Sequence, residues 1–163
     1  MYSKRTVNFL SDLDKSDADL FTRLCGFGWM IGNIVPLVYD EDDEIYGKQG
    51  FRFNELIHLE SIGLIQFGAL AFTRLKLPKT FAVLYYGKPV VLNMPNEANN
   101  SLGIGKVLLT KIGQELAPIC GSKPVEGFFD YVVGKWKSQG YLDEGTDDSS
   151  ATDASSAALS TNQ

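Results

Sequence analysis

The sequence predicts an α+β fold in which several helices accompany a small antiparallel sheet. Residues 53–65, FNELIHLESIGLI, have the pattern of a short helix that a glycine ends and an apolar extended segment follows. Two β-prone segments, Phe81–Tyr86 and Pro89–Leu92, flank a turn in the manner of a hairpin. Segment 106–116 has the pattern of a strand that runs into a capped helix. This order is typical of winged-helix modules, so residues 1–142 are expected to form one winged-helix-like domain.

The N-terminal part of the chain is expected to begin with two helices. Apolar residues form one stripe over residues 6–13. A second helix is expected from Ser16, because Ser16 and Asp19 have the spacing of a capping box, and it is expected to end near residues 26–28. Residues 29–39 are apolar and favour an extended chain toward their end.

Five consecutive acidic residues, Asp40–Glu44, follow this region. An EF-hand loop that began at Asp40 would need glycine at its sixth position and glutamate at its twelfth, where the chain has Ile45 and Phe51. A calcium site is therefore excluded. The run is expected to form a solvated loop that repels polyanions.

The helix expected over residues 53–63 is the centre of the predicted domain. Asn54 is expected to cap its start, and Gly63 to adopt the left-handed conformation that ends it. Leu56, Leu59 and Ile62 share one face, which is expected to point into the core.

A β-hairpin wing is expected after this helix. Residues 66–77 are apolar and favour a strand, and the hairpin of Phe81–Tyr86 with Pro89–Leu92 is expected to turn at Gly87-Lys88. Residues 95–105 have the composition of a loop. The segment Gly103–Lys106 lacks the spacing of a phosphate-binding loop, so no nucleotide cofactor is expected.

The C-terminal part is expected to contain a strand, two helices and a tail. Thr110 is expected to cap a helix over residues 111–119. A last helix is expected to start at Ser122 or Pro124, to run to Gln139 and to stop at Gly140. Its inner face is expected to consist of Phe129, Val132, Val133 and Trp136. Residues 143–163 are rich in Ser, Ala and Asp and are expected to be disordered.

The net charge of −5 comes from this tail, which has five acidic residues and no Lys or Arg. The remaining chain is neutral, with 15 acidic and 15 basic residues, so any argument about partners must use local charge. Cys25 and Cys120 lie in or beside apolar segments and are expected to be buried, reduced thiols of a cytoplasmic protein, in preference to a disulfide or a reactive pair. With a single histidine, a zinc site of the usual Cys/His kind is not expected. No secretory signal and no membrane span is expected.

Five segments together resemble an uncharacterised family of bacterial proteins, a domain of unknown function: SKRT near the start, DADLF, LESIGLI, LTKIGQEL and FFDYVVGKWKSQGYL. The chain resembles the C-terminal module of that family over about residues 3–142. Since the members tend to be longer, the resemblance implies a module of a larger protein. It implies no catalytic residues.

Two functions are weighed. The first is nucleic-acid binding through the wing, because residues 61–96 contain four basic residues and no acidic one: Arg74, Lys76, Lys79 and Lys88. The helix over residues 53–63 instead contains two acidic residues and no Lys or Arg, so phosphate would repel it.

The second function, which we favour, is a non-catalytic protein-interaction or assembly module that contacts a protein partner or a second copy. The candidate contact residues are Glu55, His58, Glu60, Tyr85 and Tyr86. His58 with a neighbouring glutamate could serve acid–base chemistry, but no nucleophile or oxyanion element is identifiable, so an enzyme is not expected.

Overall fold

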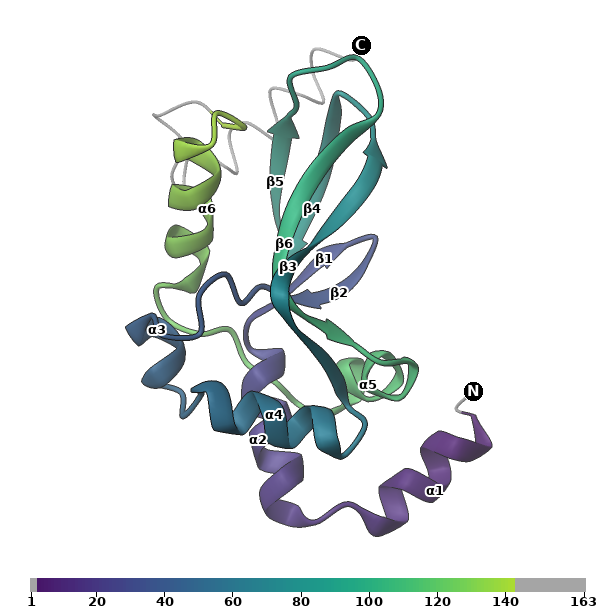
Figure 1. Cartoon of the computed structure of the whole chain (residues 1–163). Helices are drawn as coiled ribbons and strands as arrows, with labels where there is room; N and C mark the ends of the chain where they lie inside the picture. Colours follow the sequence, from purple (N-terminus) through teal and green to yellow (C-terminus); the bar gives the residue numbers. More distant parts are fainter. Residues whose placement is uncertain (1–2, 143–163) are drawn as a thin grey trace.

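The computed structural model describes residues 3–142 and shows an α+β fold (Figure 1). The tail expected at 143–163 lies outside the described residues. The elements in chain order are α1 (Lys4–Asp12), α2 (Lys15–Cys25), β1 (Gly28–Ile31), β2 (Asn33–Pro36), α3 (Glu44–Gly47), α4 (Phe53–Ser61), β3 (Ile65–Leu77), β4 (Thr80–Tyr85), β5 (Lys88–Asn93), β6 (Asn100–Leu109), α5 (Lys111–Leu116), the 3-10 turn η1 (Ala117–Ile119) and α6 (Phe128–Ser138).

The strands form two antiparallel sheets. One has four strands in the order β2-β1-β4-β5, and the other pairs β3 with β6 in a long ribbon. The β4–β5 hairpin is therefore inserted between the two strands of the ribbon. Asn100 closes the insertion: it is paired with Leu77, and its buried amide also donates to the carbonyl oxygens of Leu77 (3.2 Å) and Asn96 (2.8 Å).

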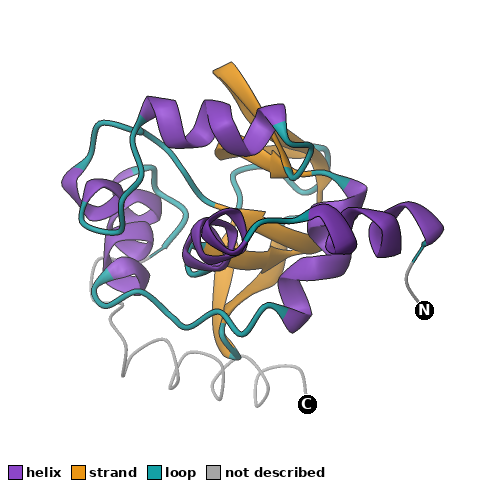
Figure 2. Ribbon diagram, turned by 90° about the horizontal axis from the view of Figure 1, so that it is seen from below, coloured by secondary structure: helices purple, strands orange, loops and turns teal. Residues whose placement is uncertain are grey.

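The core is centred on aromatic rings between the four-stranded sheet and α6. Trp29 of β1 stacks on Tyr85 of β4 and on Phe129 of α6, with ring centroids 5.2 and 5.6 Å apart, and meets Trp136 edge-on at 4.9 Å. Helices surround the strands when the molecule is seen from below (Figure 2). None of the helices within residues 3–142 has the length and apolar character that a membrane crossing would need.

Helix α1 projects from the rest of the molecule (Figures 1 and 2), and one carboxylate of α5 connects to its first turn while Phe9 and Leu13 pack against the core. Glu115 of α5 accepts hydrogen bonds from the backbone N–H of Ser3 (2.8 Å), the hydroxyl of Ser3 (3.2 Å) and the hydroxyl of the buried Thr6 (2.5 Å). These donors lower the pKa of Glu115, with Thr6 as the largest cause.

Several expected helix boundaries are confirmed. Gly63 ends α4 with a φ of 89°, and Gly140 follows α6 with a φ of 86°. The Thr110 side chain caps α5 by accepting from the Gly113 N–H at 3.1 Å. The buried faces of α4 (Leu56, Leu59) and α6 (Phe129, Val132, Val133, Trp136) also match the expectation, whereas Ile62 is only half-buried.

Three expected helix starts are wrong. Helix α2 begins at Lys15 with Asp14 as its N-cap, so Ser16 lies inside the helix. The N-cap of α4 is Arg52 rather than Asn54, because Glu55 accepts from the Arg52 N–H at 2.9 Å. Helix α6 starts only at Phe128, after Gly127 has taken a φ of 81°, which an α-helix cannot continue.

The strands also differ from the expectation at three places. Residues 28–36 form a complete hairpin, β1–β2, that turns at Gly32. The β4–β5 hairpin turns at Tyr86-Gly87 rather than Gly87-Lys88, because both turn residues have positive φ (48° and 80°), as a type I′ turn requires. Strand β6 begins at Asn100, inside the expected loop.

The acidic run is only partly a solvated loop. Glu41 forms an ion pair with Lys106 of β6 at 3.0 Å, and the Tyr131 hydroxyl of α6 donates to Asp43, which is also the N-cap of α3. Two of the five carboxylates thus connect this segment to the ribbon and to α6.

Candidate functional site

The charged residues on the outer side of α4 make contacts within the chain. Glu55 accepts from the Arg52 N–H at the start of the helix, and Glu60 accepts from the Phe67 N–H of β3 at 2.7 Å. His58 Nε2 lies 2.7 Å from Asp17 Oδ1 of α2. Glu60 and His58 therefore connect α4 to β3 and α2, whereas Glu55 caps the helix itself, and His58 remains half-exposed.

Two large apolar side chains of the same helix are also exposed. Phe53 is 54% exposed and Ile57 is 40% exposed, and the spacing of four residues places them on one face. The Phe53 ring also meets the half-buried Phe67 ring of β3 edge-on, with 5.6 Å between centroids. We call Phe53, Ile57 and Phe67 the α4 patch. This patch was not expected from the sequence, although the i, i+4 spacing of Phe53 and Ile57 could have indicated it.

The four basic candidate residues do not form one surface. Arg74 donates to the Asn33 side chain at 2.7 Å, Lys79 donates to the Met94 carbonyl at 3.2 Å, and the Lys88 ammonium lies 4.3 Å from the centre of the Phe129 ring. Lys79 precedes β4 and Lys88 begins β5, so they lie at opposite ends of the hairpin, about 20 Å apart for six residues of strand. Lys76 is exposed on β3.

Tyr85 and Tyr86 connect α2 to the segment before α6. Tyr85 is only 4% exposed, and its hydroxyl donates to the Gly26 carbonyl (2.6 Å) and accepts from the Val125 N–H (2.7 Å). The Tyr86 hydroxyl contacts the Cys25 carbonyl (3.1 Å) and the Ser122 hydroxyl (2.6 Å). Burial raises the pKa of Tyr85 to about 12 and also raises the pKa of Tyr86. Tyr85 therefore lies in the core, and Tyr86 is the member of the pair with an accessible ring.

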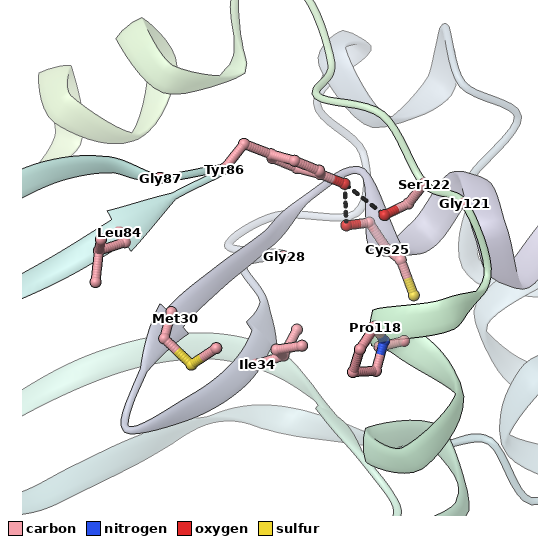
Figure 3. Close-up of a pocket in the computed structure, with 11 residues that line it drawn as sticks. Cys25, Gly28, Met30, Ile34, Leu84, Tyr86, Gly87, Pro118, Gly121 and Ser122 are labelled. Atoms are coloured by element: carbon pink, nitrogen blue, oxygen red, sulfur yellow. Dashed lines mark hydrogen bonds between the residues drawn. The ribbon is translucent and has the colours of Figure 1, made fainter.

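A cavity of about 480 Å³ lies beside Tyr86 (Figure 3). Its wall is mainly apolar, with Met30, Ile34, Leu84 and Pro118 among the lining residues, and Cys25, Tyr86 and Ser122 contribute to it as well. Strand β1, strand β2, the β4–β5 turn and η1 thus border an open space large enough for a small molecule.

Cys25 lines this cavity, and Cys120 directly precedes Gly121, which lines it too. Both thiols are free, Cys25 is buried and Cys120 is half-buried. The interaction between the two side chains raises the pKa of Cys25 and lowers the pKa of Cys120 to about 6, and the Cys120 thiol also donates to the Ala117 carbonyl at 3.3 Å. The pair was not expected from the sequence, because 94 intervening residues conceal it. Within residues 3–142, no group of three or more His, Cys, Asp or Glu residues is arranged to hold a metal ion.

Comparisons with known proteins place the chain in a family. Searches of curated proteins and of solved structures returned no match. The family described as "Protein of unknown function (DUF2806)" matches residues 1–133, which is most of the chain. The expected resemblance to a family of unknown function is therefore confirmed, and the chain belongs to the DUF2806 family.

Proposed function

We propose that this chain is a non-catalytic protein-interaction module whose docking surface is the α4 patch. The observation that supports the proposal is the exposure of Phe53 and Ile57 side by side on one helix, next to Phe67. Contiguous exposed apolar side chains on a folded domain mark interaction surfaces more often than isolated ones do. The charged side chains beside them, Glu60 and His58, make contacts within the chain and stay exposed, so α4 would offer an apolar centre with a polar rim to another molecule.

Burial of this patch by a partner would contribute a modest binding free energy. Complete burial of a Phe or Ile side chain is worth about 1.5–3 kcal/mol, and about half of each side chain remains exposed here. Covering both would therefore contribute about 2 kcal/mol. This corresponds to roughly a 30-fold change in affinity.

Charge favours a different protein over a second copy as the partner. Helix α4 contains two acidic residues and no Lys or Arg. A two-fold contact between two α4 patches would bring these like charges together, which disfavours self-association. We therefore propose a partner with an apolar surface and a basic rim, within a larger bacterial protein or system in the cytoplasm.

The alternative, nucleic-acid binding, has less support. It rests on the absence of acidic residues between positions 61 and 96. Arg74, Lys79 and Lys88 make intramolecular contacts and do not line one surface. A winged-helix interpretation stays part of the proposal, but with a different wing from the expected one. The expected wing, the β4–β5 hairpin, belongs to the four-stranded sheet, so the β3–β6 ribbon after α4 would take the place of the wing.

A variant pair tests the docking surface. Phe53→Ser with Ile57→Ser removes the α4 patch, and Leu70→Ser is the matched control, because Leu70 is 84% exposed but lies outside the patch. Proteins retained from a lysate of the source organism by the wild type and the control, but lost from the double variant, are purified and titrated by calorimetry. We expect about 30-fold weaker binding for the double variant and no change for Leu70→Ser.

Three results would contradict the proposal. One is a partner whose affinity is the same for all three proteins. Another is a dimer, detected by light scattering across concentrations, that the double variant abolishes, since the surface would then serve a second copy. The third is salt-dependent binding to duplex DNA that a Lys76, Lys79 and Lys88 charge reversal removes.

A further inference from the structure

The strongest unassigned feature is the contact between Cys25, at the end of α2, and Cys120, directly after η1. The structure holds the backbones of these two segments together at several points. The Thr22 hydroxyl donates to the Cys120 carbonyl (3.4 Å) and also to the Ala18 carbonyl within α2 (2.8 Å). The Tyr86 hydroxyl connects the Cys25 carbonyl to Ser122, two residues after Cys120. These hydrogen bonds fix the end of α2 against residues 120–122 and so hold the two cysteines near each other. We call this region the cysteine junction.

The two thiols have different environments. Cys25 is buried and lines the cavity, whereas Cys120 is half-buried and is followed by the exposed Gly121. Hydrogen bonds from Cys25 and from residues around Ser122 stabilise a thiolate at Cys120. A half-exposed thiolate next to a buried thiol is the arrangement of an attacking and a resolving cysteine.

The junction also has room for a bond to form. Gly121 has a φ of 77°, and no atom lies within 4 Å of where a side chain would start there. A disulfide needs the sulfurs about 2.05 Å apart, which is closer than hydrogen-bonded thiols. The open cavity beside Cys25 and the unpacked Gly121 give the two sulfurs space in which to approach each other.

We propose that Cys25 and Cys120 form a reversible intramolecular disulfide when the protein meets a hydroperoxide. The Cys120 sulfur attacks one peroxide oxygen, the O–O bond breaks, and the departing oxygen takes the proton released from the thiol and leaves as water. Cys120 is then a sulfenic acid. The Cys25 sulfur attacks the Cys120 sulfur, the S–O bond breaks, and the hydroxyl group leaves as a second water with the Cys25 proton. Both thiols are oxidised and one peroxide is reduced to two waters; a dithiol such as dithiothreitol then reduces the disulfide to two thiols by exchange and becomes a disulfide itself.

Hydrogen peroxide on the full chain tests this pair. After treatment the protein is alkylated with N-ethylmaleimide, digested without reductant and analysed by mass spectrometry. We expect both cysteines to lose their reactivity together, a peptide that joins Cys25 to Cys120 within a monomer, and recovery of both thiols with dithiothreitol. Disulfides only between chains, or two thiols that stay alkylatable at millimolar peroxide, would overturn the proposal.

Single variants test the order of the two steps. Cys25→Ser should stop at a sulfenic acid on Cys120, which dimedone traps, whereas Cys120→Ser should leave Cys25 at least tenfold less reactive. Circular dichroism tests whether both variants are folded. If one of them is not, the disulfide-linked peptide of the wild-type protein still tests the proposal. A sulfenic acid that accumulates on Cys25 in Cys120→Ser at the wild-type rate would contradict the assigned roles.

Discussion

Replacement of Gly105 by alanine should destabilise the protein strongly. Gly105 has a φ of 86°, and a Cβ atom there would lie 2.7 Å from the Val38 carbonyl oxygen and 2.9 Å from the Val38 backbone C and N atoms. The left-handed conformation costs a non-glycine residue about 1–2 kcal/mol. The clash also displaces the Val38 carbonyl, which accepts a hydrogen bond from the adjacent Lys106 N–H at 2.8 Å. Weakening this bond adds about 1 kcal/mol to the loss of stability.

The expected loss is therefore about 2–3 kcal/mol, which for a chain of 163 residues lowers the melting temperature by about 5–10 °C. Gly103→Ala is the matched control in the same strand, because no atom lies within 4 Å of its Cβ position and its φ is not positive. It should change the free energy of unfolding by less than about 0.5 kcal/mol. Urea denaturation followed by circular dichroism measures both, and equal shifts in midpoint for the two variants would refute the reasoning.

Tyr85→Phe should lower the free energy of unfolding by about 2–4 kcal/mol, because it leaves the buried Gly26 carbonyl and the Val125 N–H without their partner. Tyr86→Phe should lower it by about 1 kcal/mol or less. Urea denaturation measures both values, and equal losses would contradict this reasoning. The lowered pKa of Glu115 means that its contribution to docking α1 is complete above the ordinary carboxyl pKa and is lost as the pH falls through the lowered value. Hydrogen exchange should therefore show α1 amides losing protection at low pH in the wild type and already at pH 7 in Glu115→Gln; protection of α1 in that variant would refute the role of this carboxylate.

Sequence reasoning predicted the parts of the fold that local chemistry determines. Gly63, Thr110 and Gly140 end or cap helices as expected, because a left-handed φ and a hydroxyl cap depend on the residues beside them. It missed strand β6 before Lys106, because Gly103 and Gly105 look like loop residues. Gly105 is needed where β6 passes within van der Waals distance of Val38, a contact between distant segments that no local pattern records.

The candidate site was predictable only in its location. Helix α4 was identified, and its inner leucines were correct, but the roles of its outer residues depend on neighbours far away in sequence. Asp17 contacts His58 and the Phe67 N–H donates to Glu60, whereas Phe53 and Ile57 are the large apolar side chains that stay exposed on this helix. The cysteine junction was invisible for the same reason.

The closure of the inserted hairpin by Asn100 has a consequence for the order of folding. The β4–β5 hairpin is local and can form within microseconds, and it brings Leu77 and Asn100 together before β3 meets β6. Once Leu77 and Asn100 are paired, each further residue pair between β3 and β6 forms next to a pair that already exists. The chain segment that it must close is therefore short, and the entropic cost of pairing falls. We expect the ribbon to zip from the Leu77–Asn100 end toward Ile65 and Leu109, with α4 docking after its strand is in place.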